Sequence, residues 1–234
     1  MKKSSVAIIT ARGGSKRIPR KNIKLFSGQP IINYSIKAAL DSGLFDEVMV
    51  STDDLEIAEY AIKAGANVPF IRSAENSNDF AGTAEVICEV LEKYKENNII
   101  YDVGCCIYPT APFLTSETLI LGYEKFIEKK FDVLFPAIQY SYPIQRSVRV
   151  LGNGCIEMLW PENYTKRSQD LEPIFHDVGQ FYWFDSEAML NKKRLFTDNS
   201  GVLIVSEMSS QDIDNDEDWH LAELKYSLLK MNNT

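Results

Sequence analysis

The sequence predicts an α/β fold built on a mostly parallel sheet that helices cover on both faces. Over the first 138 residues, short apolar runs alternate with longer segments in which apolar residues recur every three or four positions, as strands and amphipathic helices do. Several of these runs lack polar alternation, which is typical of strands buried on both faces. Strands that alternate with helices favour crossover connections and a parallel sheet.

Each element of this first part follows from a local pattern. The apolar runs predict strands at residues 6–10, 47–52, 68–71, 103–108 and 131–138. The third of them suits a sheet edge, because Pro69 cannot donate a hydrogen bond to a neighbouring strand. The helical periodicity predicts helices from Pro30 to Gly43, over 54–65, from Thr83 onward and over 115–130. Proline suits a helix start and glycine a helix end, and Thr83 has the side chain of a helix cap.

The pattern changes between residues 141 and 175. Two β-like runs flank Gly152-Asn153-Gly154, which is a hairpin signal, and a polar loop follows. The sheet pattern then resumes at 179–184 and 201–207, and a helix is expected from about Asp216. We therefore expect a single domain over residues 1–234, with 141–175 as an excursion from its sheet.

Composition excludes several classes of protein. There are 25 Lys and Arg against 33 Asp and Glu, a formal net charge of −8, which argues against a general nucleic-acid binder. No apolar run approaches the length of a transmembrane helix, so we expect a cytoplasmic protein without a membrane partner. The four cysteines fit neither a zinc spacing nor a disulfide framework.

A cationic loop contrasts with this acidic composition. The stretch TARGGSKRIPRKN, residues 10–22, follows the first predicted strand and holds Arg12, Lys16, Arg17, Arg20 and Lys21. Its two glycines let backbone amides approach an anion without a Cβ in the way. The loop matches neither a Walker A motif nor the G-x-G-x-x-G motif. It is either an anion cradle or a solvated run of charge.

An acidic pair follows the last predicted strand. In an extended segment, Asp212 and Asp214 point to the same side, whereas Ile213 points to the core. Two carboxylates suit Mg²⁺, which also takes phosphate oxygens. The other interpretation is an acid-rich helix start that complements the helix dipole, and this suffices for Asp216, Glu217 and Asp218.

The two features predict one chemistry when they are combined. Ligands of open α/β sheets bind outside the carboxyl ends of the strands, and both features follow strands. A triphosphate needs cationic donors, and transfer at phosphorus needs Mg²⁺ to neutralise charge. The sequence therefore indicates a nucleoside triphosphate substrate and nucleotidyl or phosphoryl transfer.

These stretches also resemble the CMP-sialic acid synthetase family of cytidylyltransferases. The similarity is carried, in chain order, by residues 9–22, 47–66, 71–83, 108–113 and 210–218. The resemblance implies a nucleotide-diphosphosugar transferase fold, a Rossmann-like three-layer α/β/α sandwich. It also implies a homodimer, in which residues 141–175 form a dimerisation arm that reaches toward the sugar site of the partner.

By this resemblance, a set of residues receives roles. Lys21, Arg12, Asp212 and Asp214 are catalytic, and the two aspartates hold Mg²⁺. The nucleotide CTP is bound by Ala11, Arg12, Gly13, Lys16, Lys21, Asn22, Arg72, Ala81 and Thr83. Arg17 and Arg20 carry no such resemblance, and we expect them to be a solvated flank.

Departures from the sialic acid pattern concern the acceptor. The stretches YPTAP at 108–112, PIQR at 143–146 and HDVGQFYW at 176–183 are similar to the pseudaminic acid cytidylyltransferase branch. Tyr108 would suit a deoxy sugar, or it is a packed strand end. We expect the sugar at Tyr108, Gln180, Arg146 and Arg167, with Lys166 as a further candidate for its carboxylate. Sialic, legionaminic and 3-deoxy-octulosonic acids stay open as acceptors, as does a non-catalytic nucleotide-binding regulator.

Overall fold

The structure is a computed structural model that describes residues 3–232. Its strands are β1 Ser5–Thr10, β2 Leu25–Phe26, β3 Gln29–Pro30, β4 Glu47–Ser51, β5 Val103–Ile107, β6 Val133–Gln139, β7 Val148–Val150, β8 Ile156–Met158, β9 Phe175–Asp177, β10 Phe181–Asp185 and β11 Ser200–Ile204. Its α-helices are α1 Ile32–Ser42, α2 Leu55–Lys63, α3 Thr83–Glu96, α4 Ser116–Lys129, α5 Ser186–Lys192 and α6 Asp216–Asn232.

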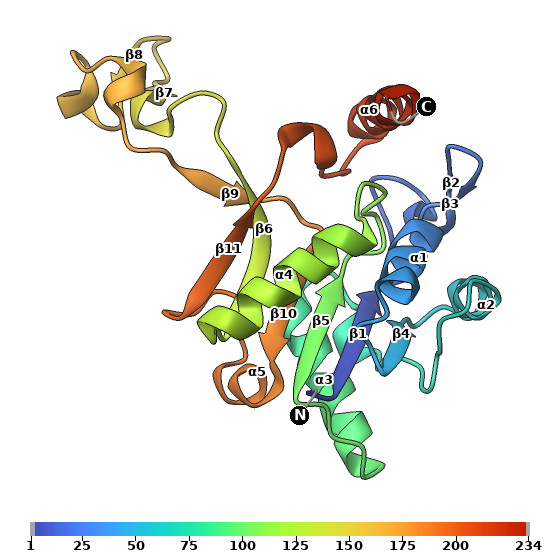
Figure 1. Ribbon diagram of the computed structural model, residues 1–234. Helices are drawn as coiled ribbons and strands as arrows, with labels where there is room; N and C mark the ends of the chain where they lie inside the picture. Colours follow the sequence, from blue (N-terminus) through green and yellow to red (C-terminus); the bar gives the residue numbers. More distant parts are fainter. Residues whose placement is uncertain (1–2, 233–234) are drawn as a thin grey trace.

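A central sheet with the strand order β11-β6-β10-β5-β1-β4 organises these elements, and β9 pairs with β6 (Figure 1). β1 runs parallel to β4 and β5, and β11 runs parallel to β6. β10 is antiparallel to β5 and β6. One hydrophobic cluster joins α1, α2 and α4 to one face of the sheet, and a second joins α3 and α5 to the other. The sheet is therefore mostly parallel and covered on both faces, as predicted.

Two local predictions are wrong in their details. Residues 68–71 form no strand, and only Asn67 forms a bridge there, with Met49. Pro30 does not open a helix but pairs with Leu25 in the β2–β3 hairpin, so that α1 begins at Ile32.

Thr83 is the first residue of α3 rather than its cap. The cap is Gly82, whose backbone N–H donates to Glu85 Oε2 at 2.7 Å. The Thr83 hydroxyl contacts the Tyr108 hydroxyl, from the end of β5, at 3.0 Å.

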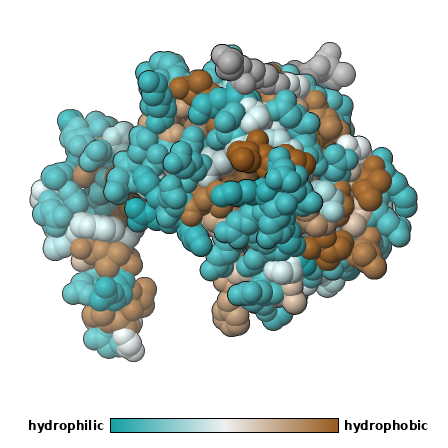
Figure 2. Space-filling view, turned by 90° about the horizontal axis from the view of Figure 1, so that it is seen from below, coloured by the Kyte–Doolittle hydropathy of each residue, from teal (hydrophilic) through white to brown (hydrophobic). Residues whose placement is uncertain are grey.

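The segment 141–175 leaves the sheet as an arm. β7 and β8 pair as the predicted hairpin, and β9 returns the chain to β6 (Figure 1). Apolar side chains of the hairpin are exposed, including Val150 at 71% and Ile156 at 63%. Figure 2 shows apolar side chains on the projecting arm. Because no part of residues 3–232 covers these side chains, this arm is a candidate contact surface.

Two predictions about the rest of the chain can be compared with the structure. Within residues 3–232, no helix combines the length and the apolar character that a membrane crossing requires. Cys88, Cys105 and Cys106 are buried free thiols, and Cys155 is an exposed one. Cys105 and Cys106 belong to the two core clusters on opposite faces of the sheet.

Candidate active site

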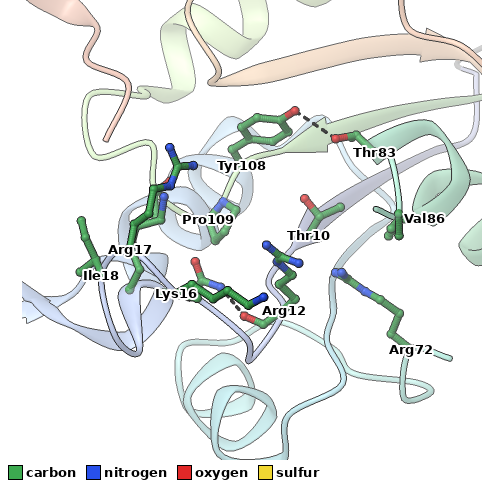
Figure 3. A pocket seen from close by; sticks show the side chains of 15 residues that line it. Thr10, Arg12, Lys16, Arg17, Ile18, Arg72, Thr83, Val86, Tyr108 and Pro109 are labelled. Atoms are coloured by element: carbon green, nitrogen blue, oxygen red, sulfur yellow. Dashed lines mark hydrogen bonds between the residues drawn. The ribbon is translucent and has the colours of Figure 1, made fainter. Parts of the chain in front are cut away.

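A cavity of about 240 Å³ opens where β1 and β5 end (Figure 3). It is lined by Thr10, Arg12, Ser15, Lys16, Arg17, Ile18, Lys21, Asn22, Arg72, Ala81, Thr83, Val86, Tyr108, Pro109 and Thr110. These residues follow strands or begin a helix, as the rule for ligand sites in open α/β sheets predicts. Most of the residues that we assigned to the nucleotide therefore meet around one cavity.

The basic loop is shaped by backbone contacts. The Asn22 side-chain amide donates to the Arg12 carbonyl oxygen at 2.9 Å, and the Gly13 N–H donates to Asp53 Oδ1 at 2.8 Å. A Cβ at position 13 would lie 2.7 Å from a carboxylate oxygen of Asp54, so only glycine fits there. Ala11 is buried and does not line the cavity. It holds the loop to the sheet through its backbone.

Carboxylates of the same chain hold two cations of the loop. Arg12 lies 2.9 Å from Asp79, which also pairs with Lys16. Arg12 donates in addition to the carbonyl oxygen of Asn78 at 3.0 Å. The neighbouring lysine is the first cause that lowers the pKa of Asp79. A triphosphate that binds these cations therefore has to replace Asp79.

Arg17 and Arg20 have different environments, although we expected both to be a solvated flank. Arg17 lines the cavity and lies 2.7 Å from the carboxylate of Asp214. Arg20 turns away and pairs with Asp54 and Glu56 at the start of α2. Arg17 is thus solvated as expected, with 68% of its side chain exposed, but it also borders the cavity. Arg20 is the less exposed of the two and anchors the loop to its neighbour.

The acidic pair lies beside Lys21. Ile213 is 1% exposed and its carbonyl oxygen accepts a hydrogen bond from Lys21 Nζ at 2.6 Å. Lys21 Nζ is also 4.0 Å from the Asp214 carboxylate. Desolvation is the main cause that lowers the pKa of Lys21. As predicted, Ile213 points to the core while Asp212 and Asp214 do not.

The electrostatics of the pair fit a divalent cation. The pKa of Asp212 is raised, first by desolvation and next by the negative charge of Asp214, and a bound cation would relieve both. Over residues 3–232, no group of three or more His, Cys, Asp or Glu side chains could enclose a metal ion. A Mg²⁺ ion here would therefore draw its remaining oxygens from phosphate and water, as this ion commonly does.

The far end of the cavity is uncharged except for one arginine. Arg72 is buried and donates through Nε to Ser51 Oγ at 3.0 Å, and burial lowers its pKa. The Thr83 and Tyr108 hydroxyls are 3.0 Å apart, and a dashed line joins them in Figure 3. Tyr108 both lines the cavity and packs on the Tyr182 ring. Hydroxyls and a fixed guanidinium are groups that can read a nucleobase edge.

Three residues that we assigned to the sugar do not line this cavity. Gln180 is buried, and its side chain donates to the Ser209 carbonyl oxygen at 2.8 Å. Arg146 contacts Ser168 at 3.2 Å and Arg167 pairs with Asp170 at 2.7 Å, both on the arm. Figure 1 shows the arm projecting from the sheet beyond β9, on the side of β6 and away from β1, and neither arginine lines the cavity.

Several cavity residues received no ligand-binding role from the sequence. They are Thr10, Ser15, Arg17, Ile18, Val86, Pro109 and Thr110. All of them except Val86 lie in the stretches 9–22 and 108–113 that follow or end predicted strands, so a usable signal was present. Val86 lies in α3, where helical periodicity does not distinguish a core side chain from one that lines a cavity.

The sequence relatives of this chain are cytidylyltransferases and related CMP-sugar synthases. Residues 6–151 match the model of the cytidylyltransferase family. The chain is 44% identical to a pseudaminic acid cytidylyltransferase of Campylobacter jejuni subsp. jejuni serotype O:2, over 96% of this chain and 97% of that protein. It is 32% identical to the CMP-N,N'-diacetyllegionaminic acid synthase of Legionella pneumophila, over 93% and 94% of the two chains.

Solved structures agree on the fold. The structure of a CMP:2-keto-3-deoxy-manno-octonic acid synthetase, solved with CTP, superposes with a TM-score of 0.71 at 18% identity, over 97% of this chain and 99% of that one. A likeness at this identity concerns the architecture, and it confirms the predicted nucleotidyltransferase fold. The resemblance inferred from the motifs is confirmed as well: the chain belongs to the cytidylyltransferase family.

Proposed function

We propose that this chain transfers CMP from CTP to the anomeric hydroxyl of a nonulosonic acid in the cytoplasm and releases pyrophosphate. Pseudaminic acid is the acceptor that we propose. The observation that carries the proposal is a single cavity lined by a cationic loop at one end and by Arg72 with Thr83 at the other. Two cations of that loop, Arg17 and Lys21, lie beside Asp214 of the acidic pair. The 44% identity with a pseudaminic acid cytidylyltransferase over nearly the whole chain supports this acceptor.

The chemistry follows from the placement of the charges. The acceptor hydroxyl attacks the α-phosphorus in line and gives up its proton to water. A bond forms between the sugar oxygen and the α-phosphorus, the bond from the α-phosphorus to the oxygen that bridges to the β-phosphorus breaks, and pyrophosphate leaves. Lys21 and Arg12 stabilise the negative charge of the phosphates and the leaving pyrophosphate. Mg²⁺, held by Asp212 and Asp214, would offset charge at the reaction centre. Arg72 and Thr83 hold the cytosine end while bonds change at the other.

A pyrophosphate-release assay tests the function. The chain is incubated with CTP and Mg²⁺ and with pseudaminic, legionaminic, sialic or 3-deoxy-octulosonic acid in turn. The largest kcat/KM is expected with pseudaminic acid. A larger value with another acid would change the proposed acceptor, and no release with any acid would favour a nucleotide-binding regulator.

The metal site has its own test. Asp212→Ala is expected to weaken Mg²⁺ binding in the presence of a non-hydrolysable CTP analogue, measured by calorimetry, and to lower turnover by at least about 100-fold. Asp216→Ala is the matched control, because Asp216 begins α6 and pairs with Lys24 outside the cavity. Turnover of Asp212→Ala close to the wild type would show that the metal assignment is wrong.

We also propose a homodimer that the arm builds. The exposed apolar side chains of the β7–β8 hairpin, among them Val150 and Ile156, are the support for this proposal. Val150→Lys combined with Ile156→Lys is expected to give a monomer in analytical ultracentrifugation, whereas the wild type sediments as a dimer. A wild-type monomer at micromolar concentration would refute it.

A further inference from the structure

Residues 177–180, from the end of β9 to the start of β10, form a wall beside the reaction centre. This β9–β10 wall carries a carboxylate, that of Asp177, which the mechanism above does not use. Asp177 is the last residue of β9 and is half-buried. Its Oδ2 accepts a hydrogen bond from the Tyr182 hydroxyl at 3.0 Å. Among the described residues, no hydrogen bond or ion pair is formed with Oδ1 of Asp177. One oxygen is thus held in place and the other is free to bind a ligand.

The neighbouring glycine locates this wall. Gly179 adopts φ +58°, and a Cβ there would lie 3.7 Å from the Tyr108 ring and 3.8 Å from Asp212 Oδ1. The chain therefore passes between a cavity-lining side chain and a carboxylate of the acidic pair. Asp177 stands two residues before Gly179 and therefore belongs to the segment that borders the reaction centre.

Under the proposed function, the nucleotide leaves this side to the acceptor. The phosphates would lie at the cationic loop that follows β1, and the base would lie at Arg72 and Thr83, which line the same cavity. An in-line attack brings the acceptor to the α-phosphorus from the side opposite the pyrophosphate. The β9–β10 wall, next to Asp212 and away from Arg12, borders this approach.

A carboxylate with a free oxygen distinguishes between the groups of an anionic sugar. It repels the carboxylate of the acceptor. It also accepts charge-assisted hydrogen bonds from hydroxyl and amide N–H groups. We propose that Asp177 is a specificity-determining residue of the acceptor site, which accepts a hydrogen bond from a hydroxyl or amide N–H of the nonulosonic acid and turns its carboxylate away. This inference rests on the proposed function.

Tyr182 is the positioning residue of this wall. It is 3% exposed, and its ring lies 5.6 Å from the ring of Tyr108. The Tyr108 hydroxyl in turn contacts Thr83. The side chain that fixes Asp177 is thereby packed against the nucleotide end of the cavity, which gives Asp177 a defined direction before any sugar binds.

Asp177→Asn tests the inference through steady-state kinetics. The KM for the acceptor is expected to rise about 10- to 100-fold, the effect of losing a hydrogen bond to a charged group, with the KM for CTP within about twofold of the wild type. The ratio of kcat/KM between pseudaminic and legionaminic acids is expected to change as well. Asp198→Asn, at an exposed position outside the cavity, is the control and should leave all constants unchanged.

Two results would overturn the inference. One is a folded Asp177→Asn variant with an unchanged acceptor KM and an unchanged ratio between the two acids. If Asp177→Asn fails to fold, Tyr182→Phe replaces it, because this variant removes only the hydroxyl that holds Asp177. An unchanged acceptor KM in Tyr182→Phe is the second result that would overturn the inference. Failure of the proposed function is distinct, because the wild type itself would then release no pyrophosphate with any acid.

Discussion

Lys21→Met is the substitution that tests the phosphate role most directly. Methionine keeps most of the length of the side chain and removes its charge. Lys21 Nζ lies 4.0 Å from the Asp214 carboxylate, where two unit charges interact by about 4 kcal/mol at an effective dielectric constant of about 20. A phosphate oxygen at a similar distance would gain an interaction of the same order. Loss of one such preorganised donor typically lowers kcat about 10²- to 10³-fold.

Pyrophosphate release with CTP and pseudaminic acid measures this loss. Lys24→Met is the matched control, since Lys24 pairs with Asp216 at 3.2 Å and lies over the Trp219 ring, outside the cavity. We expect its constants within about twofold of the wild type. If Lys21→Met also stays within about twofold in both kcat and the KM for CTP, the phosphate role of Lys21 is refuted.

The pH profile adds an independent measurement of the same residue. Desolvation lowers the pKa of Lys21 below its ordinary value, so the ammonium loses its proton at a lower pH than an exposed lysine does. Because the charged form is the active one, activity should fall as pH rises through this lowered pKa. The alkaline fall should be absent from the residual activity of Lys21→Met.

Three further outcomes are expected. Burial opposes the charge of Glu89, but hydrogen bonds from Lys93 and nearby polar groups outweigh it and lower the pKa of Glu89 to about 2. Glu89→Gln should therefore lower the free energy of unfolding above about pH 4.5, by about 1–3 kcal/mol, and the difference should vanish as pH falls toward 2. Asp79→Asn should tighten CTP binding several-fold in calorimetry, because the carboxylate competes with phosphate for two cations, and weaker binding would instead show that Asp79 positions them. A thiol reagent should label exposed Cys155 before Cys106, whose pKa burial raises to about 12, and faster labelling of Cys106 would contradict this.

Local patterns predicted most of the fold, since the periodicity of buried strands and amphipathic helices can be recognised within short windows of sequence. The wrong predictions concern segments whose structure depends on pairing with residues distant in the sequence. Residues 68–71 are as apolar as a strand, but β4 offers only one bridge to this segment, through Asn67. The placement of β10 between β5 and β6 is likewise determined by tertiary packing, because the periodicity of β10 does not indicate its neighbours or its direction.

The same distinction applies to the site. The basic loop and the acidic pair were predicted because each is a dense local motif. Arg17 was missed because its partner, Asp214, lies at the other end of the chain, and nothing in the loop distinguishes it from Arg20. The role of Asp79 was missed for the same reason, since a single aspartate in a polar segment carries no signal until the fold places it on Arg12 and Lys16.

The distance between the basic loop and the acidic pair is set by apolar packing rather than by their charges. Ile18 of the loop and Ile213 of the acidic segment are each 1% exposed and belong to one cluster with Trp219. Burying such a side chain contributes about 1.5–3 kcal/mol, whereas a solvent-exposed ion pair such as Arg17–Asp214 contributes about 0–1 kcal/mol. The buried isoleucines are therefore strong enough to keep the two segments together when the ion pairs exchange. The ion pairs are weak enough for Arg17 and its neighbours to give up their carboxylates to a triphosphate, which is what a site of this kind requires in each turnover.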